Sequence, residues 1–334
     1  MLKEIIYSCI NSFWGGILLR ITKPLFFLAG KKQRWHKYKS YRFLWSYSKE
    51  KLEKKAQNPT ARYVVINKGS YNYNYFNVAF LHNMLSSVVC VLEKGHFPVV
   101  QLKDRKEGWI NWDTYFIQPF ITDKNISNLP AYAEEDGNIK PWFDTPFNKH
   151  ELKLWSKVYR DFVVFNEQTK AYIDNEYRQI IEPHKRVLGV LYRGTDYLKL
   201  QPKGHPVQPT VDELIREVEV RMKEMKFDRI YLATEERRVV DVFERAFPGR
   251  ILVNKRKYYD DAFYGNDFEL IGQVVFDREN DDILKGLEYL SSIYLLSGCT
   301  ALIAGNAGGS CAALYMNNLN YEYWKLFELG YYGV

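Results

Sequence analysis

The chain of 334 residues is 46% apolar and 26% charged, so it is long enough for two packed cores and too apolar for a disordered protein. Its four cysteines form no C-x-x-C pair, which supports neither a zinc site nor a disulfide framework and fits a reducing compartment. Residues 1–62 carry 14 Lys/Arg and 3 Glu, a net charge of +11, whereas the rest of the chain is mildly acidic at −4, which argues against a nucleic-acid partner.

Residues 1–40 are apolar and aromatic at first and then basic. Arg20 and Lys23 interrupt the apolar stretch 5–30, so the run of about 20 uncharged residues that a spanning helix needs is missing. No small-residue cleavage site follows a short apolar core, so a secretory signal is not expected. With the basic cluster at 31–39, the pattern predicts a helical amphipathic extension. Either it lies on an anionic membrane surface, which would make the protein cytoplasmic and peripheral at the inner face of the cell membrane, or it packs on the protein's own core.

From residue 63 onward, short apolar runs alternate with longer amphipathic ones. Runs 63–67 and 97–102 predict strands, 79–94 predicts a helix, and 149–180 predicts one or two helices. These elements indicate a first α/β domain over residues 63–180.

The remaining residues, 181–334, continue the alternation, and residues 187–192 are an uninterrupted apolar run of the buried parallel-strand type. Such runs between helices indicate doubly wound parallel sheets, so we expect two Rossmann-like domains that face a cleft. The predicted strands are 187–192, 229–233, 250–253 and 300–304, and the predicted helices are 210–225, 236–247, 283–297 and 310–317.

Three segments of the second half place polar or Gly-rich residues directly after a buried strand, where open parallel sheets bind ligands. The first is Tyr192-Arg193-Gly194-Thr195-Asp196. An arginine at a strand end suits a diphosphate because its guanidinium donates two parallel charged hydrogen bonds, and the Thr195 hydroxyl adds another donor. The alternative is a turn in which Arg193 and Asp196 pair with each other.

The second segment, Thr234-Glu235-Glu236, follows the strand 229–233. Carboxylates in the first turn of a helix interact favourably with its dipole, so a structural role is sufficient to explain them. The functional interpretation is that Thr234 and Glu235 contact the ribose or base of a nucleotide.

In the third segment, a strand runs into the turn Gly305-Asn306-Ala307-Gly308-Gly309-Ser310 and then into a helix. Backbone N–H groups at such a helix start attract phosphate, and glycine permits its close approach, although packing alone also explains many Gly-rich turns. Cys311 stands where a Walker loop has lysine, so that class of NTPase is excluded.

The order and spacing of these segments resemble those of the inverting α1,2-, α1,6- and protein O-fucosyltransferases, and most closely the bacterial polysaccharide-type members. The resemblance covers residues 187–317 and extends more weakly to 68–82, which looks like the family's Gly/Asn-rich segment. The segments that carry it are Tyr192 to Asp196, Gly204-His205-Pro206, residues 230–235, and the strand 295–303 with its Gly-rich turn.

This resemblance implies a fold of the GT-B type, in which residues 63–180 form the acceptor side, residues 181–334 bind the nucleotide sugar, and no cofactor or metal takes part. Arg193 would hold the β-phosphate of a GDP-sugar and stabilise the charge that develops as the sugar-phosphate bond breaks. The other expected donor-binding residues are Tyr192, Thr195, Thr234, Glu235, Asn306, Gly308, Gly309 and Ser310, and the expected acceptor-side residues are Gly69, Asn72, Asn74 and His82. Glu288 is a further candidate for donor binding, with an exposed helical carboxylate as the alternative. His205 is a further acceptor-side candidate that could also contact the donor, with a structural role in the turn beside Pro206 as the alternative. The Asp pairs at 260–261 and 281–282 look like solvated carboxylates rather than metal ligands.

The chain also departs from the family pattern. Leu191 stands where members often have a histidine near the base, and Gln201 stands where the α1,6-type enzymes have a catalytic Glu. Attack by an acceptor hydroxyl benefits from a carboxylate that takes its proton, and Asp196 is the first candidate because it lies next to Arg193. Its alternative role is to fix the Arg193 loop.

The sequence thus predicts a fucosyltransferase-like inverting glycosyltransferase of polysaccharide biosynthesis. Its donor would be GDP-fucose in the first instance, and its acceptor a glycan or lipid-linked glycan. Two alternatives stay open. The same fold can use another nucleotide sugar, since fold does not fix substrate, or the chain can be a non-catalytic glycan- or nucleotide-binding protein.

Overall fold

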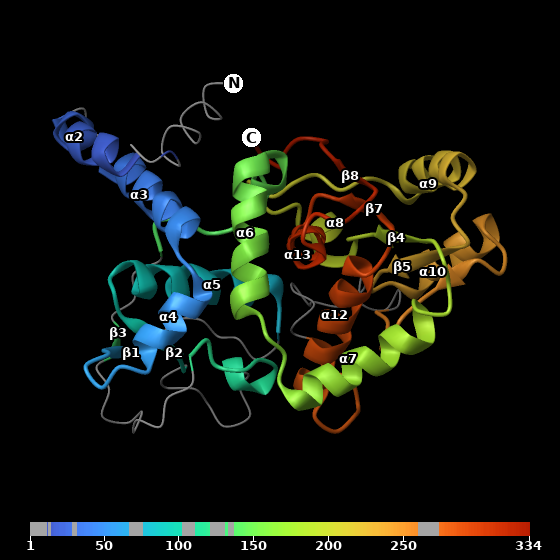
Figure 1. The fold of residues 1–334 in the computed structure, drawn as a ribbon. Coiled ribbons are helices and arrows are strands. Elements are labelled where there is room, and N and C mark those ends of the chain that lie inside the picture. The colour runs from blue at the N-terminus through green and yellow to red at the C-terminus, as the bar shows by residue number, and fades with distance from the viewer. Residues whose placement is uncertain are drawn as a thin grey trace.

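The computed structural model contains two α/β units, each built on a parallel sheet, and the two units lie side by side (Figure 1). It describes residues 12, 15–28, 32–66, 76–101, 111–120, 131–132, 137–259 and 274–334. The prediction of an α/β protein with parallel sheets is confirmed, because every pairing between the named strands is parallel.

The first unit is built around three short strands and one long buried helix. The strands β1 (Tyr63–Ile66), β2 (Phe97–Val100) and β3 (Ala131–Tyr132) pair in the order β2-β1-β3. Helix α5 (Val78–Glu93), which connects β1 to β2, is apolar nearly all round and is therefore buried on nearly all sides. Its start is fixed by Asn77, whose side chain accepts a 2.9 Å hydrogen bond from the backbone N–H of Phe80.

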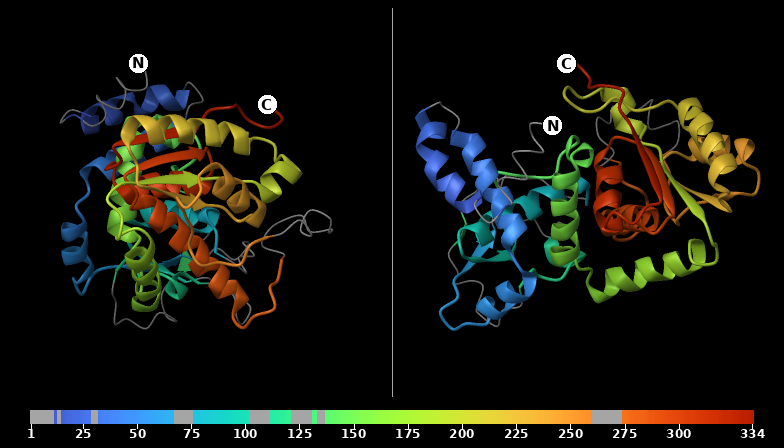
Figure 2. Two further views of the ribbon diagram at one scale, coloured as in Figure 1. Left: turned by 90° about the vertical axis from the view of Figure 1, so that its right-hand side faces the viewer. Right: turned by 45° about the horizontal axis from the view of Figure 1, so that its top comes forward.

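The second unit is a five-stranded sheet with helices on both faces (Figure 2). Its strands pair in the order β6-β5-β4-β7-β8, with β4 in the centre. Successive residues of β4 point to opposite faces, so Leu188 and Val190 join the core under α9 and α10 while Val187 and Leu191 join the core under α12 and α13. The elements are β4 (Val187–Leu191), α8 (Thr195–Leu200), α9 (Val211–Met225), β5 (Arg229–Ala233), α10 (Arg237–Ala246), β6 (Ile251–Leu252), α12 (Asp281–Ser297), β7 (Ala301–Gly305), α13 (Gly308–Asn317) and β8 (Tyr323–Phe327).

Two helices join the units. The predicted helical region 149–180 is divided into α6 (Lys149–Phe162) and α7 (Glu167–Ile180), of which α6 packs against α13 and α7 against α12. Figure 1 shows α6 between the two sheets. One hydrophobic cluster includes Leu85 of the first unit, Tyr159 of α6 and Leu290 of the second, so the core is continuous across the cleft.

The N-terminal helices differ in how they are packed. Helix α3 (Lys32–Ser46) packs on α5 and α6, and its Tyr41 and Leu44 belong to the main core, as does Ala56 of α4 (Lys49–Ala56). Residues 32–62 are thus integrated into the first unit. Helix α2 (Gly15–Leu28) packs mainly on α3, and four of its apolar side chains are 46–68% exposed: Ile17, Leu18, Ile21 and Leu25. Within the described residues, no helix has the length and apolar character needed to cross a membrane.

Candidate active site

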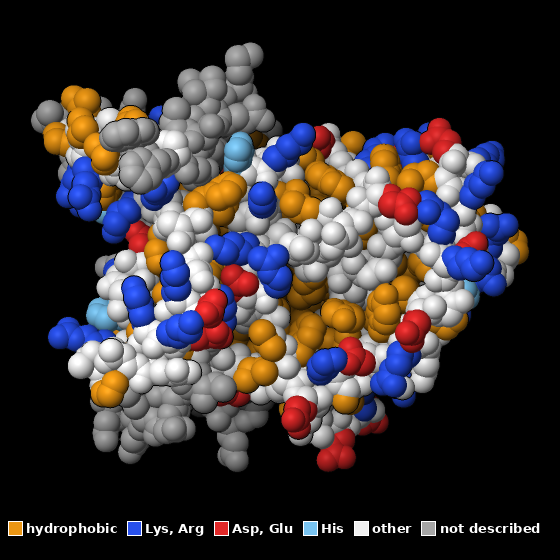
Figure 3. Space-filling model, in the orientation of Figure 1, with side chains coloured by type: hydrophobic (Ala, Val, Ile, Leu, Met, Phe, Trp, Pro, Cys, Tyr) orange, Lys and Arg blue, Asp and Glu red, His pale blue; other side chains and the backbone are white. Residues whose placement is uncertain are grey.

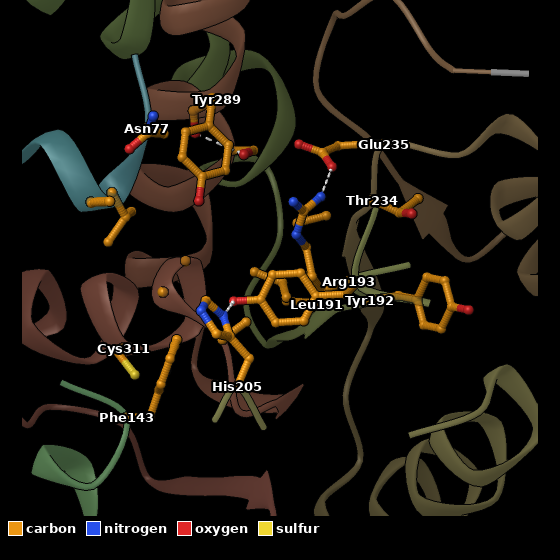
Figure 4. Close-up of a pocket in the computed structure, with 18 of the residues that line it drawn as sticks. Asn77, Phe143, Leu191, Tyr192, Arg193, His205, Thr234, Glu235, Tyr289 and Cys311 are labelled. Carbon is orange, nitrogen blue, oxygen red and sulfur yellow. Dashed lines mark hydrogen bonds and ion pairs between the residues drawn. The ribbon is translucent and has the colours of Figure 1, made fainter. Parts of the chain in front are cut away.

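A cavity of about 400 Å³ lies between the two units, at the carboxyl ends of the central strands. Leu191 of β4 pairs with Ala233 of β5 and with Ala304 of β7, so the turns that follow these three strands lie at the same edge of the sheet. The second unit contributes the residues around Arg193, Glu235 and Gly308, and the first contributes the start of α5 with Trp142 and Phe143 (Figure 4). A smaller space of about 80 Å³ adjoins the cavity and shares Asn77, Arg193, Glu235, Arg256 and Tyr289 with it.

Arg193, the predicted phosphate ligand, follows β4 and lines both spaces. Its Nη1 donates a 2.7 Å hydrogen bond to the Thr195 hydroxyl and a short charged hydrogen bond to the carboxylate of Glu235. The guanidinium also lies over the Tyr197 ring, 5.1 Å from its centroid. Figure 4 shows Arg193 pointing at Glu235. The side chain of Asp196, the predicted base and the alternative partner of Arg193, lies outside the described part of the structure.

Glu236 holds the backbone of the loop that contains Arg193. This residue is the N-cap of α10, but its side chain does not cap the helix. Its carboxylate instead accepts a 2.9 Å hydrogen bond from the backbone N–H of Thr195 and a 2.7 Å hydrogen bond from Nε of Arg238. Thr195 has a left-handed backbone with φ 46°, which is unfavourable for a β-branched residue. Gly194 is needed here because a Cβ would lie 1.7 Å from the Glu236 carboxylate.

The second predicted segment, Thr234-Glu235-Glu236, therefore supports the first, which contains Arg193. The Thr234 hydroxyl accepts a 3.3 Å hydrogen bond from the backbone N–H of Glu236, and Thr234 lines the cavity. The carboxylate of Glu235 lies between Arg193 and Arg256, with 3.7 Å between its Oε1 and Nη2 of Arg256. Sequence reasoning missed Arg256. The only signal is its position shortly after the strand β6, inside an ordinary-looking basic triplet.

In the third segment, glycines and buried side chains have different roles. Gly308 and Gly309, at the start of α13, line the cavity. The hydroxyl of Ser310 is buried, accepts a 3.0 Å hydrogen bond from the N–H of Ala307 and donates one of 2.7 Å to the carbonyl of Gly305. The Asn306 amide donates a 3.0 Å hydrogen bond to the carbonyl of Phe143 and so ties the two units together. Asn306 and Ser310 are not among the lining residues.

Two histidines, His82 and His205, line the cavity together with Arg193. His82 of α5 lines the cavity, is 8% exposed, and its Nε2 has no hydrogen-bond partner among the described residues. Burial, assisted by the charge of Lys140, lowers the pKa of His82 to about 3, so its imidazole is neutral near pH 7. His205 lies with Nδ1 3.0 Å from the Tyr197 hydroxyl and packs its ring against Phe143.

Of the remaining predicted site residues, Tyr192 lines the cavity. Glu288 lines only the smaller space, and its carboxylate is held by the guanidinium of Arg278 through two hydrogen bonds of 2.5 and 3.1 Å. Gly69, Asn72 and Asn74 fall outside the described residues. In the described part of the chain, no three His, Cys, Asp or Glu side chains lie together as metal ligands would.

No protein-family model and no curated protein sequence matches the chain. The solved structures that match the chain include fucosyltransferases. The α-1,6-fucosyltransferase NodZ from Bradyrhizobium, soaked with GDP-fucose, is 14% identical with a TM-score of 0.45, over 82% of this chain and 98% of NodZ. POFUT1 in complex with GDP is 8% identical with a TM-score of 0.49, over 81% of this chain and 99% of POFUT1. FUT1 of Arabidopsis thaliana with GDP is 9% identical with a TM-score of 0.43, over 87% of this chain and 78% of FUT1. At these identities the likeness concerns the fold alone.

Proposed function

We propose that the chain is an inverting, fucosyltransferase-like glycosyltransferase that binds a nucleotide sugar, GDP-fucose first among the donors, in the cavity between its two units. The observation that carries the proposal is the position of Arg193. Its guanidinium enters a cavity whose other walls include the Gly308-Gly309 helix start and the turn after β5. A cation and helix-start amides on one cavity are suited to a diphosphate leaving group.

In this proposal the acceptor hydroxyl attacks the anomeric carbon while the bond from that carbon to the diphosphate breaks. Arg193 and the backbone N–H groups at the start of α13 stabilise the negative charge that develops on the departing diphosphate. A base takes the proton of the attacking hydroxyl, and Asp196 remains the first candidate because it lies three residues after Arg193, in the first turn of α8.

His82 and His205 would bind sugar hydroxyls from the acceptor side. A neutral His82, buried and with an unsatisfied Nε2, is suited to hydrogen bonding and not to holding a proton at neutral pH. The proposed acceptor is a glycan or lipid-linked glycan in polysaccharide biosynthesis.

The first experiment is a thermal-shift panel of the full chain with GDP, UDP, CMP and ADP. A ligand that binds only the folded state stabilises it by about 2.7 kcal/mol at 100 times its dissociation constant. We expect GDP to raise the melting temperature, and Arg193→Ala to abolish this shift. The matched control is Arg221→Ala, which removes an ion-paired arginine of α9 that does not line the cavity.

Each outcome of the panel has a clear meaning. A shift with UDP or CMP instead of GDP would keep the fold and change the donor. No shift with any nucleotide would contradict the proposal. Binding of GDP without release of GDP from GDP-fucose, in the presence of glycan acceptors, would favour a non-catalytic binding protein.

We also propose that α2 holds the protein on an anionic membrane surface at the cytoplasmic face. Its exposed apolar side chains lie beside Arg20 and Lys23, and Figure 3 shows apolar and basic side chains together at the upper left, where α2 lies. This combination suits the boundary between acyl chains and acidic headgroups. Sedimentation with phosphatidylcholine vesicles, with and without phosphatidylserine, tests it. We expect Ile21→Ser with Leu25→Ser to abolish binding to the acidic vesicles, and Val220→Ser on α9 to have no effect.

A further inference from the structure

Arg256 is a buried cation with little to neutralise it. Its side chain is 6% exposed, and its Nε donates only a long 3.5 Å hydrogen bond to the carbonyl of Lys257. Among the described residues, the carboxylate of Glu235 is the one acidic group within ion-pair distance, at 3.7 Å. That separation is too long for a hydrogen bond, so the pair is a loose one.

Glu235 is also shared. Its Oε2 accepts the short hydrogen bond from Arg193 while Oε1 faces Arg256, so two guanidinium groups meet a single carboxylate. Among the described residues that line the smaller space, the other acidic one is Glu288, and it is already paired with Arg278. The carboxylate that faces Arg256 is therefore already engaged by Arg193, and no closer acidic partner of Arg256 lies among the described residues. Because a buried cation that is only loosely paired is costly, Arg256 is suited to an anion that approaches its guanidinium more closely.

The same three residues separate the two spaces. Arg193, Glu235 and Arg256 line both the 400 Å³ cavity and the 80 Å³ space beside it. A phosphate group presents two oxygens to a guanidinium in the same way as a carboxylate does. An anion that enters from the cavity can thus take the position of the Glu235 carboxylate without a rearrangement of the strands that hold the two arginines.

We propose that Arg256 is a second phosphate-binding residue, and that Arg193 and Arg256 together take the diphosphate of the donor in exchange for the carboxylate of Glu235. This inference rests on the proposed function, because it assumes a nucleotide diphosphate in the cavity. Glu235 acts as an internal counter-ion that holds the two arginines in place while the donor is absent. The exchange makes Glu235 a competitor of the donor.

The experiment is a calorimetric titration of the full chain with GDP and with GMP. We expect Arg256→Gln to raise the dissociation constant of GDP at least tenfold and to reduce the preference for GDP over GMP. Arg256→Lys keeps the positive charge but loses the guanidinium, which can donate two parallel hydrogen bonds to a phosphate, and this variant is expected to lose part of the affinity for GDP. Glu235→Gln is expected to lower the dissociation constant of GDP at least threefold, because the competitor is gone.

Arg221→Gln on α9 is the matched control, and the melting temperature without ligand shows whether each variant is folded. If wild type binds neither nucleotide, the proposed function fails. If wild type binds GDP and Arg256→Gln binds it as tightly, the second phosphate contact is refuted while the function stands. Weaker GDP binding by Glu235→Gln would refute the exchange. Should Arg256→Gln not fold, Arg256→Lys and Glu235→Gln decide the question by the same criteria.

Discussion

Replacement of Glu236 by alanine is expected to weaken nucleotide binding, although Glu236 itself does not line the cavity. Its carboxylate accepts the backbone N–H of Thr195 and thereby holds Thr195 in a left-handed conformation. Arg193 lies two residues before Thr195 and donates to its hydroxyl, so the position of the guanidinium depends on this bond.

Two contributions of opposite sign determine how much Glu236→Ala changes the free energy of unfolding. A buried N–H group that loses its acceptor costs about 1–3 kcal/mol. The left-handed backbone of Thr195 stores about 1–2 kcal/mol, which is released when the loop relaxes. The pair with Arg238 contributes little because that arginine is half-exposed. We therefore expect the free energy of unfolding to change by less than about 2 kcal/mol, while the loop conformation that places Arg193 becomes a minor one. If its population falls to about a tenth, the apparent dissociation constant rises about tenfold.

The assay is urea unfolding and GDP titration of Glu236→Ala beside Glu236→Gln. The glutamine variant keeps an oxygen that can accept the Thr195 N–H, so its affinity is expected to stay within about threefold of wild type. A folded Glu236→Ala that binds GDP as tightly as wild type would refute the reasoning, because the loop would then be held by something else.

Three further changes test other parts of the structure. The pKa of His82 is lowered to about 3 from an ordinary 6.5, so below pH 6.5 the unfolded state binds a proton that the folded state does not bind. The free energy of unfolding therefore decreases by about 1.4 kcal/mol for each unit by which the pH is lowered. His82→Leu is expected to remove this loss, so its stability relative to wild type rises by about 2 kcal/mol between pH 7 and 5; a pH-independent difference in urea unfolding would contradict this. Gly286→Ala places a Cβ 2.0 Å from the Tyr115 hydroxyl and is expected to cost about 1–3 kcal/mol, part of which Tyr115→Phe should recover in the double variant. Ser310→Ala leaves the buried N–H of Ala307 without its acceptor and is expected to lower stability by about 1–3 kcal/mol, and an unchanged melting temperature would show that the turn finds another acceptor.

The sequence was informative where burial on both faces left a clear pattern. The strands β4 and β7 are uninterrupted apolar runs, and β5 is one after its first residue, Arg229. Their parallel pairing places the three motif turns at one edge of the sheet. The edge strand β8 escaped prediction because it is only partly buried and mixes Tyr, Trp and Lys. Arg256 escaped for a different reason. Nothing in a basic triplet distinguishes a solvated arginine from a buried one, since its burial depends on elements that are distant in the sequence.

Glu235 and Glu236 show why adjacent residues of one motif could not be assigned from the sequence. Glu236 is in an extended conformation at the N-cap of α10, and successive side chains of an extended chain point to opposite sides. Glu235 therefore meets the guanidinium of Arg193 in the cavity, while Glu236 meets the backbone behind it. One carboxylate occupies the proposed phosphate position and the other supports the loop, so removing them should change GDP affinity in opposite directions. If both substitutions weaken binding, both carboxylates serve to place Arg193, and the phosphate position lies elsewhere in the cavity.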